Sequence, residues 1–287
     1  MTLGKVIDGR LASNAVLATL SDEIVSLQSK HNIKPKLVVI IVGDDPASQI
    51  YVRNKAKFAK KIGMLSEIIE LPNSISQIDL SVVITELNSD NSVHGIIVQL
   101  PLPKHINSLS VLSQINPVKD VDGFNPLNVG KLHIGDDSGM VPCTALGVLH
   151  LLKTVTDLDG KNAVVLGRSQ IVGKPTAALL LRNNCTVTIA HSHSINLSEI
   201  TRSADILISA VGRPKFLTEE YFKEGSVVID VGITRVESQS GYALFGDVDF
   251  ENVLHKISHI TPVPGGVGPM TIAFLLSNTI KAAKALL

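Results

Sequence analysis

Residues 162–175 have the sequence NAVVLGRSQIVGKP, which predicts a buried strand, a glycine turn and the start of a helix. The strand is expected over 162–166 and the helix over 172–182. Glycine at 167 and 173 lets the backbone approach a ligand, and the first N–H groups of the helix can bind an anion. This order suits the pyrophosphate of a dinucleotide. The spacing is not GxGxxG, so an ordinary strand-to-helix turn remains an alternative.

The end of the next predicted strand, 185–190, indicates which dinucleotide would bind. An NAD site usually has an acidic residue there, about 20 residues after the glycines, to hold the ribose hydroxyls. Here the chain continues as AHSHS over 190–194, without a carboxylate, and Arg168 lies in the turn itself. A cation and hydroxyls without an acid favour the 2′-phosphate of NADP. His191 and His193 would need further ligands to hold a metal, and we expect no metal site.

Two series of alternating strands and helices predict an α/β fold with two domains. In the first series, helices are expected over 12–30, 47–63 and 75–88, with strands over 36–42 (KLVVIIV), 65–71 and 93–100. In the second, a helix over 144–155 precedes strand 162–166, and later strands are expected over 204–210, 226–231 and 257–260. We expect the second domain to be a Rossmann-type doubly wound parallel sheet, with a ligand cleft between the domains. The expected boundaries are 1–120 plus the terminal helix 270–287, a connection at 121–139 rich in Asn, Asp, Gly and Pro, and 140–269.

Composition excludes several classes of function. Lysine plus arginine and aspartate plus glutamate both number 26, so no basic face for nucleic acid is expected. Trp is absent, which argues against a base-stacking platform. No apolar run reaches the roughly 18 residues that cross a bilayer. With no secretory start, we expect a soluble cytoplasmic protein in which Cys143 and Cys185 are buried thiols, although a disulfide between them remains possible.

Lys55 occupies an unusual position on the helix predicted over 47–63. At about 100° per residue it falls near the centre of an apolar face, one turn from Tyr51. An inward-facing cation is costly unless it has a partner, and loss of water favours the neutral amine that acid/base catalysis uses. The alternative is that the side chain extends to a nearby surface.

Three polar segments follow predicted strands. Gln99, in VQLPLP at 98–103, ends a strand and is therefore expected to meet Lys55 at the carboxyl edge of the sheet. Asp120 and Asp122 lie in the segment KDVDGF, where a solvated turn is the alternative. The segment PVPGGVGPMT at 262–271 suggests close approach of backbone to a ligand, or a domain hinge, or both.

Over nearly its whole length the chain resembles the bifunctional methylenetetrahydrofolate dehydrogenase / methenyltetrahydrofolate cyclohydrolase family. The resemblance is carried by long motifs in the family's order. They are Tyr51-x-x-x-Lys55, VQLPLP at 98–103, NPVKDVDGFNP at 116–126, PCT at 142–144, GRSxIVGxP at 167–175, VIDVGI at 228–233, GDV at 246–248 and PVPGGVGPMT at 262–271.

The resemblance implies oxidation of 5,10-methylenetetrahydrofolate to the 5,10-methenyl form with NADP, followed by hydrolysis to 10-formyltetrahydrofolate in the same cleft. It implies a homodimer formed through the nucleotide-binding domains. Lys55 is similar to the catalytic lysine, Gln99 to its hydrogen-bonding partner, Tyr51 to the residue that packs on folate, and Asp122 to the residue that holds the pterin ring. Further implied folate contacts are Ser48, Val98, Leu100, Pro264 and Gly265; implied cofactor contacts are Thr144, Gly167, Arg168, Ser169, Ile171, Ser192, Ala210, Gly212, Ile233, Gly268 and Thr271.

The sequence departs from the family at Ala145, where proline usually follows PCT. Proline is optional in a first helical turn, so a small geometric change is expected, with activity kept. Three alternatives remain open. A short-chain dehydrogenase also uses Tyr-x-x-x-Lys, but there the glycine loop precedes the pair, whereas here Tyr51 precedes Gly167. The others are an NADP-sensing binding protein and an enzyme with only one of the two activities.

Overall fold

The protein, described here by a computed structural model covering residues 3–238 and 241–287, separates into two compact units. Unit 1 comprises the described residues up to Asn14 and those from Thr144 to Thr271. Unit 2 comprises residues 15–143 and 272–287. The boundary falls inside three helices, α1 (Gly9–His31), α6 (Cys143–Lys153) and α10 (Val267–Ala285).

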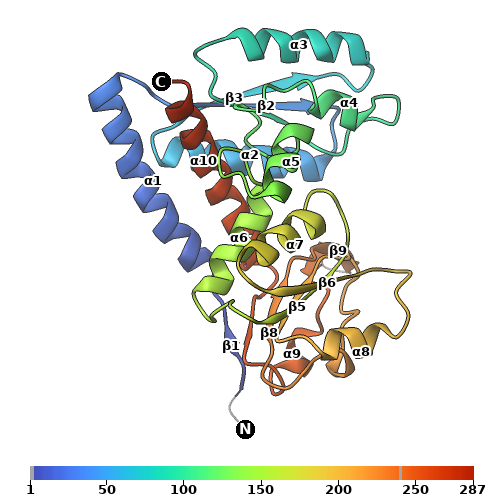
Figure 1. The fold of residues 1–287 in the computed structure, drawn as a ribbon. Helices are drawn as coiled ribbons and strands as arrows, with labels where there is room; N and C mark the ends of the chain where they lie inside the picture. The colour runs from blue at the N-terminus through green and yellow to red at the C-terminus, as the bar shows by residue number, and fades with distance from the viewer. Residues whose placement is uncertain (1–2, 239–240) are drawn as a thin grey trace. The chain divides into compact units, whose positions relative to one another are not determined.

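Unit 2 is built on a parallel sheet of order β3-β2-β4, with β2 at Lys36–Val42, β3 at Leu65–Leu71 and β4 at Gly95–Val98. Alternate residues of β2 enter two different cores. Leu37, Val39 and Ile41 pack with residues of α1, α2 (Pro46–Lys61) and α10, whereas Val38, Ile40 and Val42 pack with α3 (Gln77–Ser89) and α4 (Ser108–Leu112). Figure 1 shows α2 and α3 on opposite sides of this sheet. Because both faces are covered, the strand is apolar without alternation.

The helices of unit 2 begin at residues that satisfy free backbone amides. Asp45 Oδ2 accepts the Ser48 N–H at 2.8 Å and Pro46 occupies the first turn of α2. A fifth helix, α5 (Pro126–Ile134), begins after Asn125 and ends at Gly135, whose φ of 82° is left-handed. Residues 121–139 therefore belong to unit 2 and contain a helix, whereas the sequence suggested a connection. Their Asn, Gly and Pro residues cap and terminate that helix.

Unit 1 is a six-stranded sheet of order β1-β11-β8-β7-β5-β6 in which each neighbouring pair is parallel. In Figure 1, α7 (Gly173–Arg182) lies on one side of the sheet, and α8 (Leu197–Arg202) and α9 (Phe250–Val253) on the other. The predicted α/β fold with a doubly wound parallel sheet is confirmed. The strands are β1 Lys5–Val6, β5 Asn162–Leu166, β6 Thr186–Ala190, β7 Ile206–Ser209, β8 Val227–Asp230 and β11 His259–Ile260.

The order of the strands reverses at β5, whose neighbours are β6 and β7. Such a switch point is where open α/β sheets bind ligands, outside the carboxyl ends of the strands. The unpredicted strand β1 places residues 3–14 in unit 1, although the sequence suggested the other domain. β1 has only two residues, which are too few to show the alternation of apolar and polar side chains that predicts a strand.

Three further features complete the fold. An antiparallel hairpin, β9 (Thr234–Ser238) with β10 (Gly241–Phe245), was also not predicted. Cys143 and Cys185 are both free and buried, so the alternative of a disulfide is wrong. No helix in residues 3–238 or 241–287 is long and apolar enough to span a membrane.

Candidate functional site

Lys55 lies on the buried face of α2 at the point where that face opens. Val52, Ala59 and Ile62 are 2%, 0% and 4% exposed, which confirms the predicted apolar face. Tyr51, however, is 43% exposed, and Lys55 is only partly buried. Burial raises the pKa of the Tyr51 phenol, which therefore stays neutral. The sequence placed Lys55 near the centre of a closed face, whereas the structure leaves it accessible beside an exposed aromatic ring.

The partner of Lys55 is Gln99, as its place after β4 indicated. Lys55 Nζ donates to Gln99 Oε1 at 3.0 Å, Gln99 Nε2 donates to the Leu100 carbonyl at 2.7 Å, and the Gln99 N–H donates to Ile40 O at 2.8 Å. Gln99 is therefore held through its backbone N–H and through its side-chain NH₂ group, and its Oε1 faces the amine of Lys55. Val98 and Ser48 flank this position and are both buried. Because this acceptor is neutral and fixed, it orients the amine of Lys55 without forming an ion pair with it.

Asp122 lies close enough to Lys55 for their charges to interact. Burial raises the pKa of Asp122, and the charge of Lys55 partly opposes that rise. The Cys143 thiol donates to the Val121 carbonyl at 3.2 Å and lies 4.0 Å from Asp122 Oδ1. Asn278 Nδ2 donates to Val121 O at 2.8 Å. The backbone beside Asp122 is therefore anchored, and the residue as a whole is partly buried.

The other carboxylate of this segment, Asp120, has a structural role. It is 1% exposed and accepts hydrogen bonds of 2.8 Å from the Asn125 N–H and from Asn128 Nδ2. Burial raises its pKa to about 6, despite these donors. Asp120 therefore shapes the loop that precedes α5, whereas the structure shows no such donors for the Asp122 carboxylate among the residues that it describes. The alternative of a solvated turn does not hold for either residue.

The glycine turn of unit 1 lies at the switch point of its sheet. Gly167 has a φ of 122°, and a side chain there would overlap the Ala210 carbonyl at the end of β7. A side chain at Gly173 would overlap the Gly167 carbonyl. The sequence suggested that the first amides of α7 are free, but Ser169 Oγ accepts from Val172 and Gly173, at 3.2 and 3.3 Å. The Ser169 hydroxyl, three and four residues before these two amides, therefore accepts hydrogen bonds at the start of α7.

The side chains near this turn fit NADP. Arg168 and Ile171 are exposed at the turn, and Ser192 is exposed after β6. The turn after β6 is closed by the His191 N–H donating to Ser194 Oγ at 2.9 Å, and it contains no carboxylate. A cation and a hydroxyl are thus both exposed after the carboxyl ends of β5 and β6, as the prediction of NADP requires. Nowhere in the described residues do three His, Cys, Asp or Glu side chains gather as a metal site.

The loop from Pro262 to Thr271 is held within unit 1 from two sides. Ser13 Oγ donates to the Pro269 carbonyl at 3.1 Å, and the hydroxyls of Thr144 and Thr271 lie 3.2 Å apart. Gly265 has a φ of 113°, a conformation that favours glycine. The other predicted contacts of unit 1 that are exposed are Gly212, Ile233, Pro264 and Gly268.

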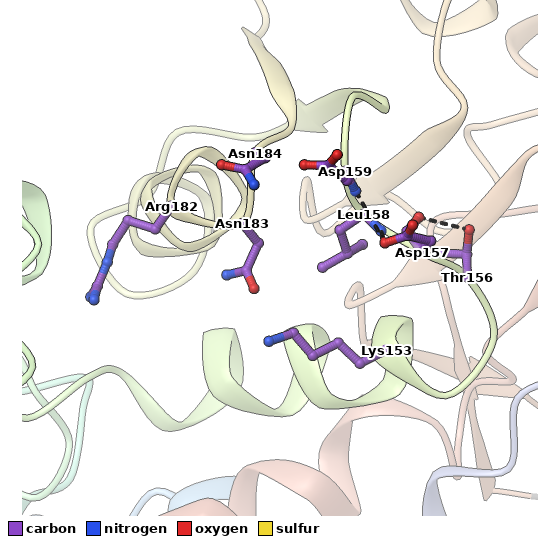
Figure 2. Close-up of a pocket in the computed structure, with 8 residues that line it drawn as sticks. All are labelled: Lys153, Thr156, Asp157, Leu158, Asp159, Arg182, Asn183 and Asn184. Atoms are coloured by element: carbon purple, nitrogen blue, oxygen red, sulfur yellow. Dashed lines mark hydrogen bonds between the residues drawn. The ribbon is translucent and has the colours of Figure 1, made fainter.

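Another hollow of unit 1 lies away from these residues. Figure 2 shows it, with a volume of about 630 Å³, between the end of α6, the end of α7 and the loop at 156–159. These segments directly precede β5 and β6, so the hollow lies at the amino ends of the strands, and no predicted site residue lines it. Open α/β sheets bind their ligands at the opposite edge.

A glycine turn at the switch point of one parallel sheet, and an oriented lysine at the carboxyl edge of another, define a dinucleotide-dependent α/β enzyme. Residues 7–122 match the family model for the tetrahydrofolate dehydrogenase/cyclohydrolase catalytic domain, and residues 142–287 match that for its NAD(P)-binding domain. The chain belongs to the tetrahydrofolate dehydrogenase/cyclohydrolase family. The predicted resemblance is confirmed, and the alternative of a short-chain dehydrogenase is set aside.

Relatives of similar length support this assignment. The chain is 56% identical over 283 residues to the bifunctional protein FolD of Rickettsia bellii, covering 98% of this chain and 99% of the relative. The bifunctional FolD enzyme of Campylobacter jejuni is 49% identical, with a TM-score of 0.95 and 99% of each chain covered. The Trypanosoma brucei enzyme, solved with NADP cofactor and inhibitor, is 42% identical, with a TM-score of 0.96 and 99% of each chain covered.

Sequence reasoning missed several residues that shape the site. Cys143 and Asn278 anchor the segment of Asp122, and two buried carboxylates, Asp230 and Asp247, contact the loops after β7 and β8. The last two lie in motifs that were noted, VIDVGI and GDV. The local signal for Asp230 was an acidic residue at the end of an apolar strand, and that for Asp247 was an acidic residue after a glycine.

Proposed function

We propose that this protein oxidises 5,10-methylenetetrahydrofolate to 5,10-methenyltetrahydrofolate with NADP and hydrolyses the product to 10-formyltetrahydrofolate. The observation that carries the proposal is the hydrogen bond between Lys55 Nζ and Gln99 Oε1, in a chain that matches both family domains. The names of the relatives refer to both activities, which favours a bifunctional enzyme over one with a single activity.

The residues of unit 2 act on the folate. Tyr51 offers an exposed ring on which a flat pterin can pack, and the carboxylate of Asp122, a partly buried residue, can accept its N–H groups. Val98 and Leu100, on either side of Gln99, pack their side chains into the core with α3 and α4 and fix the backbone that faces the folate. Orienting the folate in this way accounts for much of the expected rate, because positioning removes the entropy cost of the encounter.

The residues of unit 1 act on the cofactor. Bound NADP supplies the acceptor of the hydride that leaves the one-carbon bridge. Arg168 and Ser192 bind the 2′-phosphate, while Gly167 and Ala210 let the backbone approach the dinucleotide. Thr144, Ile233, Gly268 and Thr271 complete the contacts. Because no carboxylate follows β6, NADP is preferred over NAD.

The hydrolytic step depends on Lys55. Water attacks the methenyl carbon, which is already an electrophilic cation, and the bond from that carbon to N5 then breaks, so that the carbon stays on N10 as the formyl group. One proton of the water passes to N5, and the other must be released. The amine of Lys55, oriented by Gln99, handles this proton and polarises the reacting region. In this proposal Gln99 is a positioning residue, since it acts through the lysine.

One assay tests both activities. We expect the protein, mixed with 5,10-methylenetetrahydrofolate and NADP, to produce NADPH and a transient methenyl absorbance that decays as the product is hydrolysed. NAD should support a lower rate. NADPH formation with a stable methenyl product would contradict the hydrolytic step, and binding of NADP without any folate-dependent change would indicate a sensing protein.

We also propose that the protein works in the cytoplasm as a homodimer. The open edge of β6, the outermost strand of the unit 1 sheet, is a surface on which a second copy could add. Light scattering after size exclusion should give twice the chain mass of 30.6 kDa. A monomer at micromolar concentration would contradict this proposal.

A further inference from the structure

Unit 1 contains two buried carboxylates that the proposed chemistry does not use. Asp230 ends β8 and is 3% exposed, and Asp247 follows the hairpin and is 0% exposed. Among the residues that the structure describes, no lysine or arginine forms an ion pair with either. Their hydrogen-bond donors come instead from backbone amides and one hydroxyl.

Asp247 holds the loop that follows β7. Its Oδ2 accepts from Ser209 Oγ at 2.9 Å and from the Val211 N–H at 2.8 Å, and its Oδ1 accepts from the Arg213 N–H at 2.8 Å. These donors lie on both sides of Ala210 and Gly212, the two residues of this loop expected to contact the cofactor. One carboxylate therefore fixes the path of the whole loop.

Asp230 holds the turn that follows β8 and the segment that carries Asp247. Its Oδ1 accepts from the Gly232 N–H at 2.9 Å and the Asp247 N–H at 3.1 Å, and its Oδ2 accepts from the Val248 N–H at 2.9 Å. Gly232 directly precedes Ile233, which is expected on the nicotinamide side. Asp230 thus binds the backbone of Asp247, and the Asp247 carboxylate binds the loop after β7, so the two carboxylates link the two loops.

Two glycines are required by this arrangement. A side chain at Gly232 would overlap the Asp247 carboxylate, and a side chain at Gly246 would overlap the Asp230 carboxylate. Each carboxylate therefore lies directly against the backbone of the other's segment. Substitution of either glycine would separate the carboxylates from their donors.

The position of the loop after β7 also affects the glycine turn. The Ala210 N–H donates to Leu166 O at 2.8 Å, and the Ala210 carbonyl lies where a side chain of Gly167 would be. A shift of this loop would therefore reach the turn that is expected to bind the pyrophosphate.

Stability alone does not explain two buried carboxyl groups. Removing a carboxylate from water costs several kcal/mol, and apolar groups of similar size often stabilise a core as well or better. What a carboxylate offers is several strong acceptor sites within one small group, which can fix several backbone amides at once. Here those amides belong to loops at the carboxyl ends of β7 and β8, beside the switch point of the sheet.

We propose that Asp247, supported by Asp230, is a positioning residue for the nicotinamide end of the cofactor. This inference rests on the proposed function. Asp247 touches neither substrate nor cofactor in the proposal, and it acts by fixing Ala210–Arg213 and, through Asp230, Gly232 and Ile233. Loss of its acceptor atoms lowers the affinity for NADP and the rate of hydride transfer. The rate of the hydrolytic step, which needs no NADP, stays unchanged.

The test compares Asp247→Asn with the wild type in both half-reactions. The asparagine keeps the size of the side chain but turns an NH₂ group toward a backbone N–H. We expect KM for NADP to rise by about tenfold or more, because a hydrogen bond to a charged group is lost. Hydrolysis of added 5,10-methenyltetrahydrofolate should keep its wild-type rate. The matched control is Asp249→Asn, whose side chain is bonded to Asn252 and Lys215 near the surface.

Each outcome decides the proposal. If both activities of Asp247→Asn fall together with an unchanged KM for NADP, the residue only maintains the fold and the inference is wrong. If the asparagine variant does not fold, Ser209→Ala removes one donor and leaves the carboxylate; an unchanged KM there also overturns the inference. A wild-type protein without NADP-dependent oxidation would instead contradict the proposed function.

Discussion

Lys55→Met should reduce the hydrolysis of 5,10-methenyltetrahydrofolate to an undetectable rate and leave the affinity for NADP unchanged. Methionine keeps the length and apolar stem of lysine, so the packing of α2 against Val39 and Ile41 should survive. The amine that donates to Gln99 Oε1 is lost, and with it the group that handles the proton of the attacking water. General acid–base groups contribute about 10²–10⁴-fold to rates, so the loss should lie in this range or beyond.

The matched control is Lys57→Met. Lys57 lies two residues away on the same helix, on its exposed face. Removing it makes the same change in charge and composition without touching the site, so the hydrolytic rate should stay near that of the wild type. NADP binding, measured by fluorescence, reports on unit 1 in both variants. Wild-type hydrolysis by Lys55→Met would remove Lys55 from the mechanism.

Three strands could be predicted together with their bounds. The predicted bounds of residues 36–42, 65–71 and 162–166 are the observed bounds of β2, β3 and β5. β2 and β5 are buried runs rich in β-branched residues, which gives a strong local signal. β3 is a half-exposed edge strand, and its end is marked by Pro72 and Asn73. The strand β1 has two residues and is stabilised only by pairing with β11, a contact between distant parts of the chain. Nothing local distinguishes such a segment from a loop.

The candidate site shows the same division. Gln99 could be expected near Lys55 because the carboxyl ends of parallel strands share one edge of a sheet. The opposite roles of Asp120 and Asp122 could not be deduced, since they depend on Asn128, eight residues after Asp120, which turns back to bond it. The accessibility of Lys55 depends on what covers α2, and helical periodicity alone does not contain that information.

Gly173→Ala should abolish NADP-dependent oxidation while keeping hydrolysis of added methenyl substrate. The new methyl group would overlap the carbonyl of Gly167 and come within 3.0 Å of the Arg168 amide nitrogen, and both belong to backbone. Gly167 has a φ of 122° within a tight turn, and its backbone cannot move aside as the end of a flexible side chain can. The turn must therefore open. Since Arg168 is carried by that turn, its guanidinium would move away from the 2′-phosphate. We expect the affinity for NADP to fall by about 100-fold, equivalent to two or more charge-assisted hydrogen bonds.

The control for this prediction is Gly130→Ala, which adds the same methyl group within α5. No atom lies within 4 Å of that methyl position, and alanine favours a helix over glycine by about 0.5–1 kcal/mol. That variant should therefore bind NADP normally and melt at an equal or higher temperature. Calorimetric titration with NADP measures the affinity, and hydrolysis of the methenyl substrate shows that unit 2 is folded in both variants. Wild-type NADP affinity in Gly173→Ala would mean that the cofactor does not use this turn, and the assignment of the dinucleotide site would have to be abandoned.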